Sequence, residues 1–527
     1  MKLKALAMTG ALALALATTP AAAKTFRYAF QGDLNALDPY TLNESFTLGA
    51  LGNVMEGLTK RDKELKIVPG LAERWEMVDP LKWRFHLRRG VKFHGGEDFT
   101  ADDVVFSTAR MFSPDSQIQT RAPKDMKAVK VDDYTVDFVL TSPNPILHAE
   151  WDTWYIFSKK WAEANGATQA QSAKATSLNP FALKANGTGP FTIVSHEPGV
   201  KTVFKPNPNW WGKPEHNLTE VIFQTIKSDP TRVAALLSGD IDMMDPVPVQ
   251  DIDRLKSNPN VSVLIGPEIR TIFLNMDSMR AELLYSSVKG KNPFKDPRVR
   301  KAFYQAIDIE AIHTKVMRGM SVNSALMISP LLYARAAEFK RHPYDVAAAK
   351  KLLAEAGYPA GFEVDLDCPN DRYVNDEGIC QAVAQMLARI DIKVKLNAMP
   401  KAKYFQKAGP TDKYDSSFNL LGWTPGSLDS WNVLANIVGC RDADGKGGTF
   451  NFGGYCNPQI TALNAQILVE PDTKKRDELI AQAFRLNHEE VGLIPLHQQS
   501  LIWGTSKKVK MVQRADNQIL FYWVSMQ

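Results

Sequence analysis

The sequence predicts an α/β protein built from more than one lobe, and two observations support this prediction. The chain has 527 residues, which is more than a single hydrophobic core usually serves. Segments with the two-residue period of β-strands alternate with segments of helical period, and residues 221–242 have the pattern strand, capped helix, strand. A βαβ unit of this kind joins parallel strands. The predicted fold class is therefore α/β.

The composition is that of an ordinary soluble globular protein, with 44% hydrophobic and 23% charged residues. The formal net charge of +5 falls to +3 without Lys2 and Lys4, which lie in a segment that we expect to be removed. So small a charge on a chain of this size gives no reason to expect binding to nucleic acid or to an anionic membrane.

Residues 1–23 have the three parts of a secretory signal peptide. Lys2 and Lys4 give a basic start, residues 6–17 form an apolar run, and Ala21-Ala22-Ala23 offers a small-residue cleavage site. The apolar run is too short to span a bilayer, and no later run approaches the roughly 18 apolar residues of a membrane span. No cysteine follows the site for a lipid anchor. We therefore expect cleavage near Ala23 and a soluble, periplasmic mature protein.

Four cysteines in an exported protein fit two disulfides, for which three pairings are possible. The spacing favours Cys440 with Cys456, because they enclose a turn-rich loop, and this leaves Cys368 with Cys380. A metal site would need a denser set of ligands, such as a CxxC or HxxxH pattern, and the sequence has none near these cysteines.

Two segments in the first part of the mature chain have clear local signals. Trp83, Phe85 and Leu87 alternate with polar residues, which predicts a half-buried strand. Thr100 occupies the position of a helix N-cap, with two aspartates in the first turn. The other predicted elements here are a strand at 25–31, a turn at 37–39, a helical stretch from 45 to 58, and a hairpin at 131–140 with its turn at Asp132-Asp133.

Helix starts in the later part of the chain are predicted from aspartates in the N-cap position. Asp229 precedes Pro230, whose φ suits the first helical turn, and Asp296 and Asp345 begin two further helices. The remaining predicted elements are strands at 221–226, 362–368, 392–396 and 417–421, and helices at 229–238, 296–307, 345–356, 379–390 and 459–490.

Residues 71–107 carry three motifs in order: LAERWE at 71–76, WRFHLRRGVKFHGG at 83–96 and TADDVVFS at 100–107. This string resembles the signature of family 5 of the bacterial extracellular solute-binding proteins, the peptide-type receptors of ABC importers. Shorter strings at 188–191, 207–211 and 296–303 are also similar to family segments. The resemblance therefore covers almost the whole mature chain.

The resemblance implies a two-lobed fold of the type II-like periplasmic binding proteins, with a small subdomain inserted in lobe one. Lobes that close around a solute by hinge motion present a form that a transporter can recognise. The expected partners are an inner-membrane ABC permease and its ATPase subunits, and the expected state is a monomer. The expected segments are lobe one at 24–57, 186–273 and 495–527, the inserted subdomain at 58–185, and lobe two at 274–494.

The sequence contains no GxSxG, HExxH, Walker A or GxGxxG motif. Residues 286–289 match S-x-x-K, but no partner motif accompanies them. The nine histidines are scattered and are expected at the surface or in the core, with His94 and His497 the least easily dismissed as ligands. We therefore expect a binding protein rather than an enzyme, with no cofactor and no metal site.

Arg372 follows the predicted strand 362–368, and ligands bind at the carboxyl ends of strands in open α/β sheets. The resemblance aligns it with the arginine that binds the ligand carboxylate in dipeptide-binding relatives, and it places Trp423 in a Gly-Trp segment that lines the cleft. We also expect Tyr373 and Asn43 to contact the ligand. A solvated loop arginine and a core tryptophan are the alternatives.

The chain departs from the peptide-binding pattern at Gly426. Dipeptide- and oligopeptide-binding relatives have an aspartate there, three residues after the tryptophan, which neutralises the α-amino group of the peptide. Either Asp429 or Glu44 supplies this charge by another geometry, or the ligand has no free α-amino group. A buried unpaired ammonium group costs several kcal/mol, so the difference matters.

The leading prediction is a receptor for a short peptide or a peptide-like, carboxylate-bearing solute. An opine or other amino-acid conjugate, an oligosaccharide and a metal chelate are alternatives within the same receptor class. A secreted hydrolase would need a nucleophile held by a base and an orienting group. A periplasmic chaperone or signalling partner would bind unfolded chains or a sensor protein, without a saturable small ligand.

Overall fold

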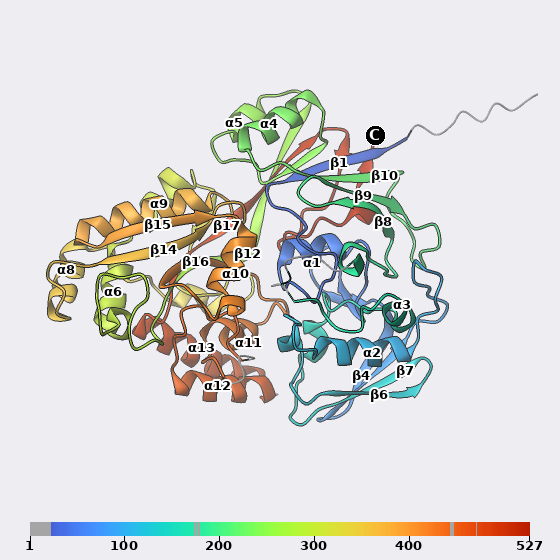
Figure 1. The fold of residues 1–527 in the computed structure, drawn as a ribbon, viewed down its shortest axis with the longest axis horizontal. Helices are drawn as coiled ribbons and strands as arrows, with labels where there is room; N and C mark the ends of the chain where they lie inside the picture. Colours follow the sequence, from blue (N-terminus) through green and yellow to red (C-terminus); the bar gives the residue numbers. More distant parts are fainter. Residues whose placement is uncertain (1–22, 173–174, 176–179, 443–446, 471) are drawn as a thin grey trace, which may run out of the picture.

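The computed structural model describes residues 23–172, 175, 180–442, 447–470 and 472–527, so the predicted signal peptide lies almost wholly outside it. The described chain forms two lobes, as predicted (Figure 1). Two long strands, β12 (Val261–Met276) and β17 (Ile494–Ser506), pair with each other and connect the lobes. The residue boundaries expected for each lobe stay predictions.

One 11-stranded sheet continues through both lobes, in the order β15-β14-β16-β12-β17-β11-β1-β10-β9-β8, with β13 paired to β17. The predicted βαβ unit is present, but its two strands do not touch, because β1 lies between β10 and β11 and pairs in parallel with both. The other strands of this sheet are β1 (Thr25–Phe30), β8 (Phe191–Glu197), β9 (Lys201–Pro206), β10 (Glu220–Thr225), β11 (Met243–Asp245), β13 (Ser321–Asn323), β14 (Glu363–Pro369), β15 (Lys393–Met399) and β16 (Phe418–Trp423).

A separate four-stranded sheet, ordered β4-β5-β7-β6, belongs to the first lobe. Its strands are β4 (Ala72–Asp79), β5 (Lys82–Leu87), β6 (Lys127–Asp132) and β7 (Thr135–Val139). The predicted strand at Trp83 and the predicted hairpin are confirmed, but the turn lies one residue later than expected, at Asp133-Tyr134. Asp103 accepts a hydrogen bond from the backbone N–H of Thr100 at 2.9 Å, where α2 begins. The helices and the small hairpin here are α1 (Ser45–Leu51), α2 (Ala101–Met111), α3 (Lys159–Ala164), β2 (Thr59–Arg61) and β3 (Ile67–Pro69).

Helices cover the second lobe and the end of the first. Two predictions are corrected: Ser228, not Asp229, caps α4, and the helix expected over 459–490 is two helices, because Pro471 disfavours the helical conformation before it. The helices are α4 (Asp229–Ser238), α5 (Ile252–Lys256), α6 (Pro297–Ala306), α7 (Ile309–Ala311), α8 (Val346–Glu355), α9 (Asp376–Leu387), α10 (Lys401–Ala408), α11 (Ser430–Val433), α12 (Pro458–Val469) and α13 (Thr473–Glu490). No helix in the described ranges is long and apolar enough to cross a membrane.

The core of the first lobe is rich in aromatic side chains. Trp151 and Trp154 are fully buried, and their rings lie 4.9 Å apart between centroids. Phe138 of β7 packs on Trp151 at 4.5 Å. This packing fixes the segment 150–154, which reaches the space between the lobes.

The structure confirms both predicted disulfides, Cys368–Cys380 and Cys440–Cys456. Cys368 lies on β14 and Cys380 on α9, and both are fully buried. Cys456 is exposed and Cys440 is partly exposed. The two bridges therefore differ in their access to solvent.

Mild reduction of the folded protein should open Cys440–Cys456 before Cys368–Cys380, because an attacking thiolate must reach a sulfur atom. Alkylation of the new thiols and peptide mass spectrometry will identify the cysteines that react first. Earlier labelling of Cys368 and Cys380, in protein whose circular dichroism is still native, would contradict this order.

Candidate functional site

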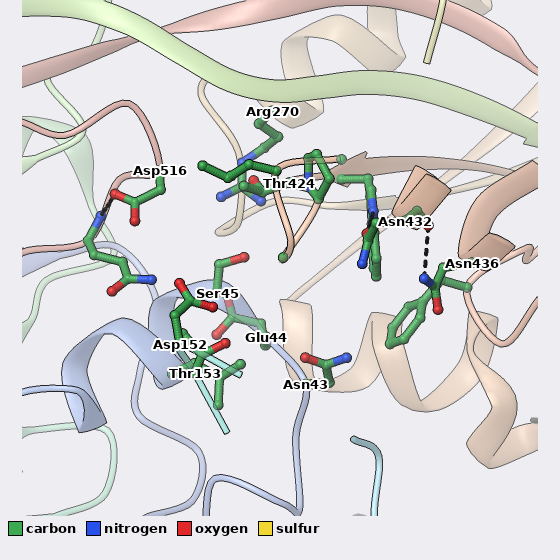
Figure 2. Close-up of a pocket in the computed structure, with 18 of the residues that line it drawn as sticks. Asn43, Glu44, Ser45, Asp152, Thr153, Arg270, Thr424, Asn432, Asn436 and Asp516 are labelled. Atoms are coloured by element: carbon green, nitrogen blue, oxygen red, sulfur yellow. Dashed lines mark hydrogen bonds between the residues drawn. The ribbon is translucent and has the colours of Figure 1, made fainter. Parts of the chain in front are cut away.

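A cavity with about 930 Å³ of empty space lies between the lobes. Figure 2 shows Glu44 and Asp152 on one side of this cavity, and Arg270 and Asn432 on the other. A second cavity of about 800 Å³ adjoins it and shares lining residues with it. Five of the six residues predicted to contact the ligand line the first cavity: Asn43, Glu44, Arg372, Tyr373 and Trp423.

Glu44 is the N-cap of α1, where its carboxylate accepts hydrogen bonds from the backbone N–H groups of Phe46 and Thr47 at 3.1 and 2.9 Å. The same carboxylate lies 2.7 Å from Arg372 and 3.3 Å from Lys401. Burial by itself would raise the pKa of Glu44, but the two cations and the helix N–H groups hold it well below its usual range. Glu44 is therefore ionised and already has two cationic partners.

Two arginines lie next to the ring of Tyr373 at one end of the cavity. The guanidinium carbon of Arg372 is 5.1 Å from the ring centroid and that of Arg270 is 5.7 Å from it. Each side chain has one carboxylate partner, Glu44 for Arg372 and Glu268 for Arg270. The Nε of Arg372 is buried without an acceptor in the described part of the chain. This donor of Arg372 therefore still needs an acceptor, which a bound anion could supply.

Trp423 ends β16 and lines the cavity beside Phe450, with ring centroids 4.7 Å apart. Its indole N–H donates to the side-chain oxygen of Asn432 at 3.0 Å. Asn436 is held in turn, because its amide donates to the backbone oxygen of Asn432 at 2.8 Å (Figure 2). The tryptophan thus both forms an apolar wall and orients a polar side chain.

Asp429 is not among the residues that line the cavity. It caps α11, accepting a hydrogen bond from the N–H of Trp431 at 2.8 Å, and its two oxygens lie 2.8 and 2.9 Å from Arg476. Gly426 does line the cavity. The carboxylate that we considered as a replacement for the missing aspartate therefore has other partners.

Six charged residues of the lining were not predicted from the sequence. Arg61 lies 2.9 Å from Asp152 and also donates to the backbone oxygen of Gly426 at 3.1 Å. A charged residue inside an aromatic stretch, as in Glu150-Trp151-Asp152-Thr153-Trp154, was the available signal for this wall of the cavity. The missed residues are Arg61, Arg121, Glu150, Asp152, Arg270 and Asp516.

Among the described residues, no group of three or more His, Cys, Asp or Glu side chains is arranged to hold a metal ion. His497 lies on β17, away from the lining of the cavity, and burial lowers its pKa to about 3. His94 also lies outside the lining, where its ring nitrogen is 3.0 Å from the backbone oxygen of Gly189. Neither histidine belongs to the cavity.

Comparison with known proteins gives relatives along the full chain. The dipeptide-binding protein of Escherichia coli K12 is 28% identical over 521 residues, which cover 93% of this chain and 92% of that protein. The periplasmic binding protein DppA of Helicobacter pylori, solved with the peptide STSA, superposes with a TM-score of 0.83 at 24% identity, covering 95% of this chain and 98% of that one. AgaA of Agrobacterium tumefaciens R10, solved with agropinic acid, superposes with a TM-score of 0.80 at 24% identity, covering 95% of this chain and 99% of that one.

The family model for the bacterial extracellular solute-binding proteins, family 5, matches residues 66–445. This range contains the signature motifs at 71–107 as well as Arg372 and Trp423. It covers well over half of the chain, and the superposed structures have the same two-lobed fold. The chain belongs to family 5 of the bacterial extracellular solute-binding proteins.

Proposed function

We propose that this protein is the periplasmic receptor of an ABC importer and that it binds a short peptide or a peptide-like, carboxylate-bearing solute between its lobes. The observation that carries the proposal is the pair of buried arginines, Arg270 and Arg372, at one end of the cavity. A guanidinium group holds a carboxylate with two hydrogen bonds in one plane. The relatives named for dipeptide binding support the peptide class.

The other walls of the cavity suit a solute of mixed polarity. Tyr373 and Trp423 offer aromatic surfaces, and Phe405 and Phe450 line both this cavity and the adjoining one. The hydroxyl of Thr424 is buried without a hydrogen-bond partner among the described residues. Apolar walls with a few convergent polar groups are typical of small-ligand sites.

In this role the protein is a receptor and not an enzyme, and it acts as a monomer with a separate inner-membrane permease and its ATPase subunits. The signal peptide of residues 1–23 would direct it to the periplasm. The predicted lobe segments at 24–57, 186–273 and 495–527, the inserted subdomain at 58–185 and the second lobe at 274–494 then describe the two halves that close on the solute.

An amino-acid conjugate such as an opine is the second candidate, and Gly426 favours it. This position has no carboxylate for a peptide α-amino group, whereas the carboxylate-binding arginines suit either class. AgaA, which was solved with agropinic acid, shows that the fold accommodates such a ligand.

Native mass spectrometry of the protein purified from its own periplasm, followed by mild unfolding, will test the proposal. A tightly bound ligand stabilises the folded receptor by mass action and co-purifies with it. We expect a released solute that carries a carboxylate, with short peptides first among them. A solute without a carboxylate would contradict the proposal, and so would an empty protein whose melting temperature no peptide or opine raises.

A further inference from the structure

Four carboxylates line the cavity between the lobes, and one of them differs from the rest. Glu44, Asp152 and Asp516 each have a cationic side chain within 4.0 Å. For Glu150 no such cation exists among the described residues. A buried carboxylate is normally paired, so this unpaired one needs a physical explanation.

Glu150 is buried, with 3% of its surface exposed, and is built into a defined setting. The amide of Asn432 donates to its two oxygens at 3.2 and 3.1 Å, and the indole of Trp423 fixes that amide from the other side. Glu150 and Asn432 come from different lobes, so this contact crosses the cavity. An amide is a neutral donor, so the negative charge of the carboxylate is offset only in part, by the positive charge of Arg121, which forms no ion pair with it.

Gly426 leaves open the space beside this carboxylate. A Cβ atom built on Gly426 would lie 3.9 Å from Oε2 of Glu150 and 4.0 Å from the amide nitrogen of Asn432, which is ordinary van der Waals contact. The φ of Gly426 is not positive, so its backbone does not demand glycine. An aspartate at this position would bring a second carboxylate against Glu150, and the two like charges would repel each other.

We propose that Glu150 replaces the aspartate missing at position 426 and holds a primary ammonium group of the ligand in the space beside Gly426. The inference rests on the proposed function and narrows the ligand class to a solute with a free amino group as well as a carboxylate. A short peptide with an unmodified amino terminus has both groups. Burial raises the pKa of Glu150, and a ligand ammonium group would favour its ionised form.

Arg121 is the cation nearest to this space, since its Nη1 would lie 3.6 Å from the same Cβ atom. Its donors are directed elsewhere, to the backbone oxygen of Glu150 at 3.1 Å, to the hydroxyl of Thr153 at 2.5 Å and to Asn43 at 3.0 Å. Arg121 therefore fixes the segment that carries Glu150 and leaves the carboxylate oxygens as acceptors. Glu44 and Asp429 are already paired with cations, so neither is a comparable anchor.

The wild-type protein allows a first test without any mutation. Thermal-shift and calorimetric titrations would compare a mixture of unmodified L-dipeptides with the same mixture after N-acetylation. We expect the unmodified mixture to bind about 30-fold or more tightly, the effect of removing one partner of a buried charge pair. Equal binding of the two mixtures would overturn the inference while leaving the proposed function intact. If only carboxylate-bearing solutes without a free amino group bind, the inference fails and the proposed function stands. If no peptide and no opine binds, the proposed function fails and the inference fails with it.

Glu150→Gln keeps the shape of the side chain and removes its charge. It should weaken binding of the unmodified dipeptides about 30-fold or more and leave the N-acetylated ones unchanged. Asp429→Asn is the matched control, because Asp429 was the other carboxylate that the sequence suggested as a partner for the ligand ammonium group. This variant should still prefer dipeptides with a free amino group. The inference would be overturned if Glu150→Gln still bound unmodified dipeptides more tightly than N-acetylated ones. It would also be overturned if Asp429→Asn lost this preference.

A second substitution keeps the proposal testable if the first variant is unstable. Gly426→Asp in the Glu150→Gln background restores one carboxylate to the same space, and the Cβ contacts leave room for it. We expect this double variant to recover binding of the unmodified dipeptides relative to Glu150→Gln alone. No recovery, in protein that melts cooperatively, would show that the ammonium group is not bound beside Gly426.

Discussion

Replacing Asp38 with alanine should lower the free energy of unfolding by about 3–5 kcal/mol, because it leaves a buried guanidinium group without its counter-charge. Asp38 accepts two hydrogen bonds from Arg110, at 3.0 and 2.6 Å, and both side chains are almost fully inaccessible to solvent. Arg110 also donates to the backbone oxygens of Ala167 and Gln169 at 2.9 and 3.0 Å. The pair therefore ties the turn before α1 to α2 and to the segment that follows α3.

Chemical denaturation monitored by tryptophan fluorescence will measure this effect. Asp98 is a matched control, because it forms an equally short ion pair with Lys92 at 2.6 Å, but 67% of its side chain is exposed. Asp98→Ala should have little effect, since water replaces an exposed partner. The double variant Asp38→Ala/Arg110→Met should be more stable than the sum of the single changes predicts. Similar losses for Asp38→Ala and Asp98→Ala would contradict the role of burial.

Local interactions of this fold could be predicted from the sequence. Asp296 and Asp345 cap α6 and α8 as expected, because an N-cap side chain accepts a hydrogen bond from an N–H only two or three residues away. The N-cap of α4 was predicted one residue too late, at Asp229 instead of Ser228. Serine and aspartate are both good capping residues, and the sequence alone does not decide between two of them in adjacent positions.

Long-range pairings of the site could not be predicted in this way. Glu44 was a candidate from the sequence, but its partner Lys401 is 357 residues away, and Arg110 is 72 residues from Asp38. Such pairs depend on how β12 and β17 bring the lobes together, which no local pattern encodes. The resemblance to the family identified Arg372 and Trp423, whereas the structure was needed to place Arg121 and Arg270 in the cavity.

Replacing Glu44 with glutamine should shift the protein towards an open arrangement of its lobes and destabilise the closed form by about 3–5 kcal/mol. Glu44 belongs to the first lobe, and its two cationic partners, Arg372 and Lys401, come from the second. All three side chains are at most 5% exposed. Glutamine can still cap α1, but it leaves two buried cations near each other without a counter-charge. Separation of the lobes exposes both cations to water and so removes this free-energy cost.

Small-angle scattering of the unliganded protein will measure the opening as a larger radius of gyration, and titration with the ligand will measure the accompanying loss of affinity. Glu363→Gln is the matched control, because Glu363 pairs with Lys393 at 3.2 Å on the exposed surface of the second lobe. It should leave both the scattering profile and the affinity unchanged. A Glu44→Gln profile identical to that of the wild type would show that this carboxylate does not hold the lobes together.

The pH dependence of the Glu44→Gln variant separates electrostatic opening from a general loss of packing. Burial lowers the pKa of Lys401, although Glu44 partly opposes this shift in the wild type. A buried amine whose pKa lies below its unfolded value costs free energy while it is charged, and the cost falls as rising pH removes the proton. The variant should therefore recover compactness as the pH is raised towards the pKa of Lys401, and the wild type should change less. If the radius of gyration of the variant exceeds that of the wild type by the same amount over this whole pH range, lost hydrogen bonds or packing, and not the unpaired cations, open the lobes.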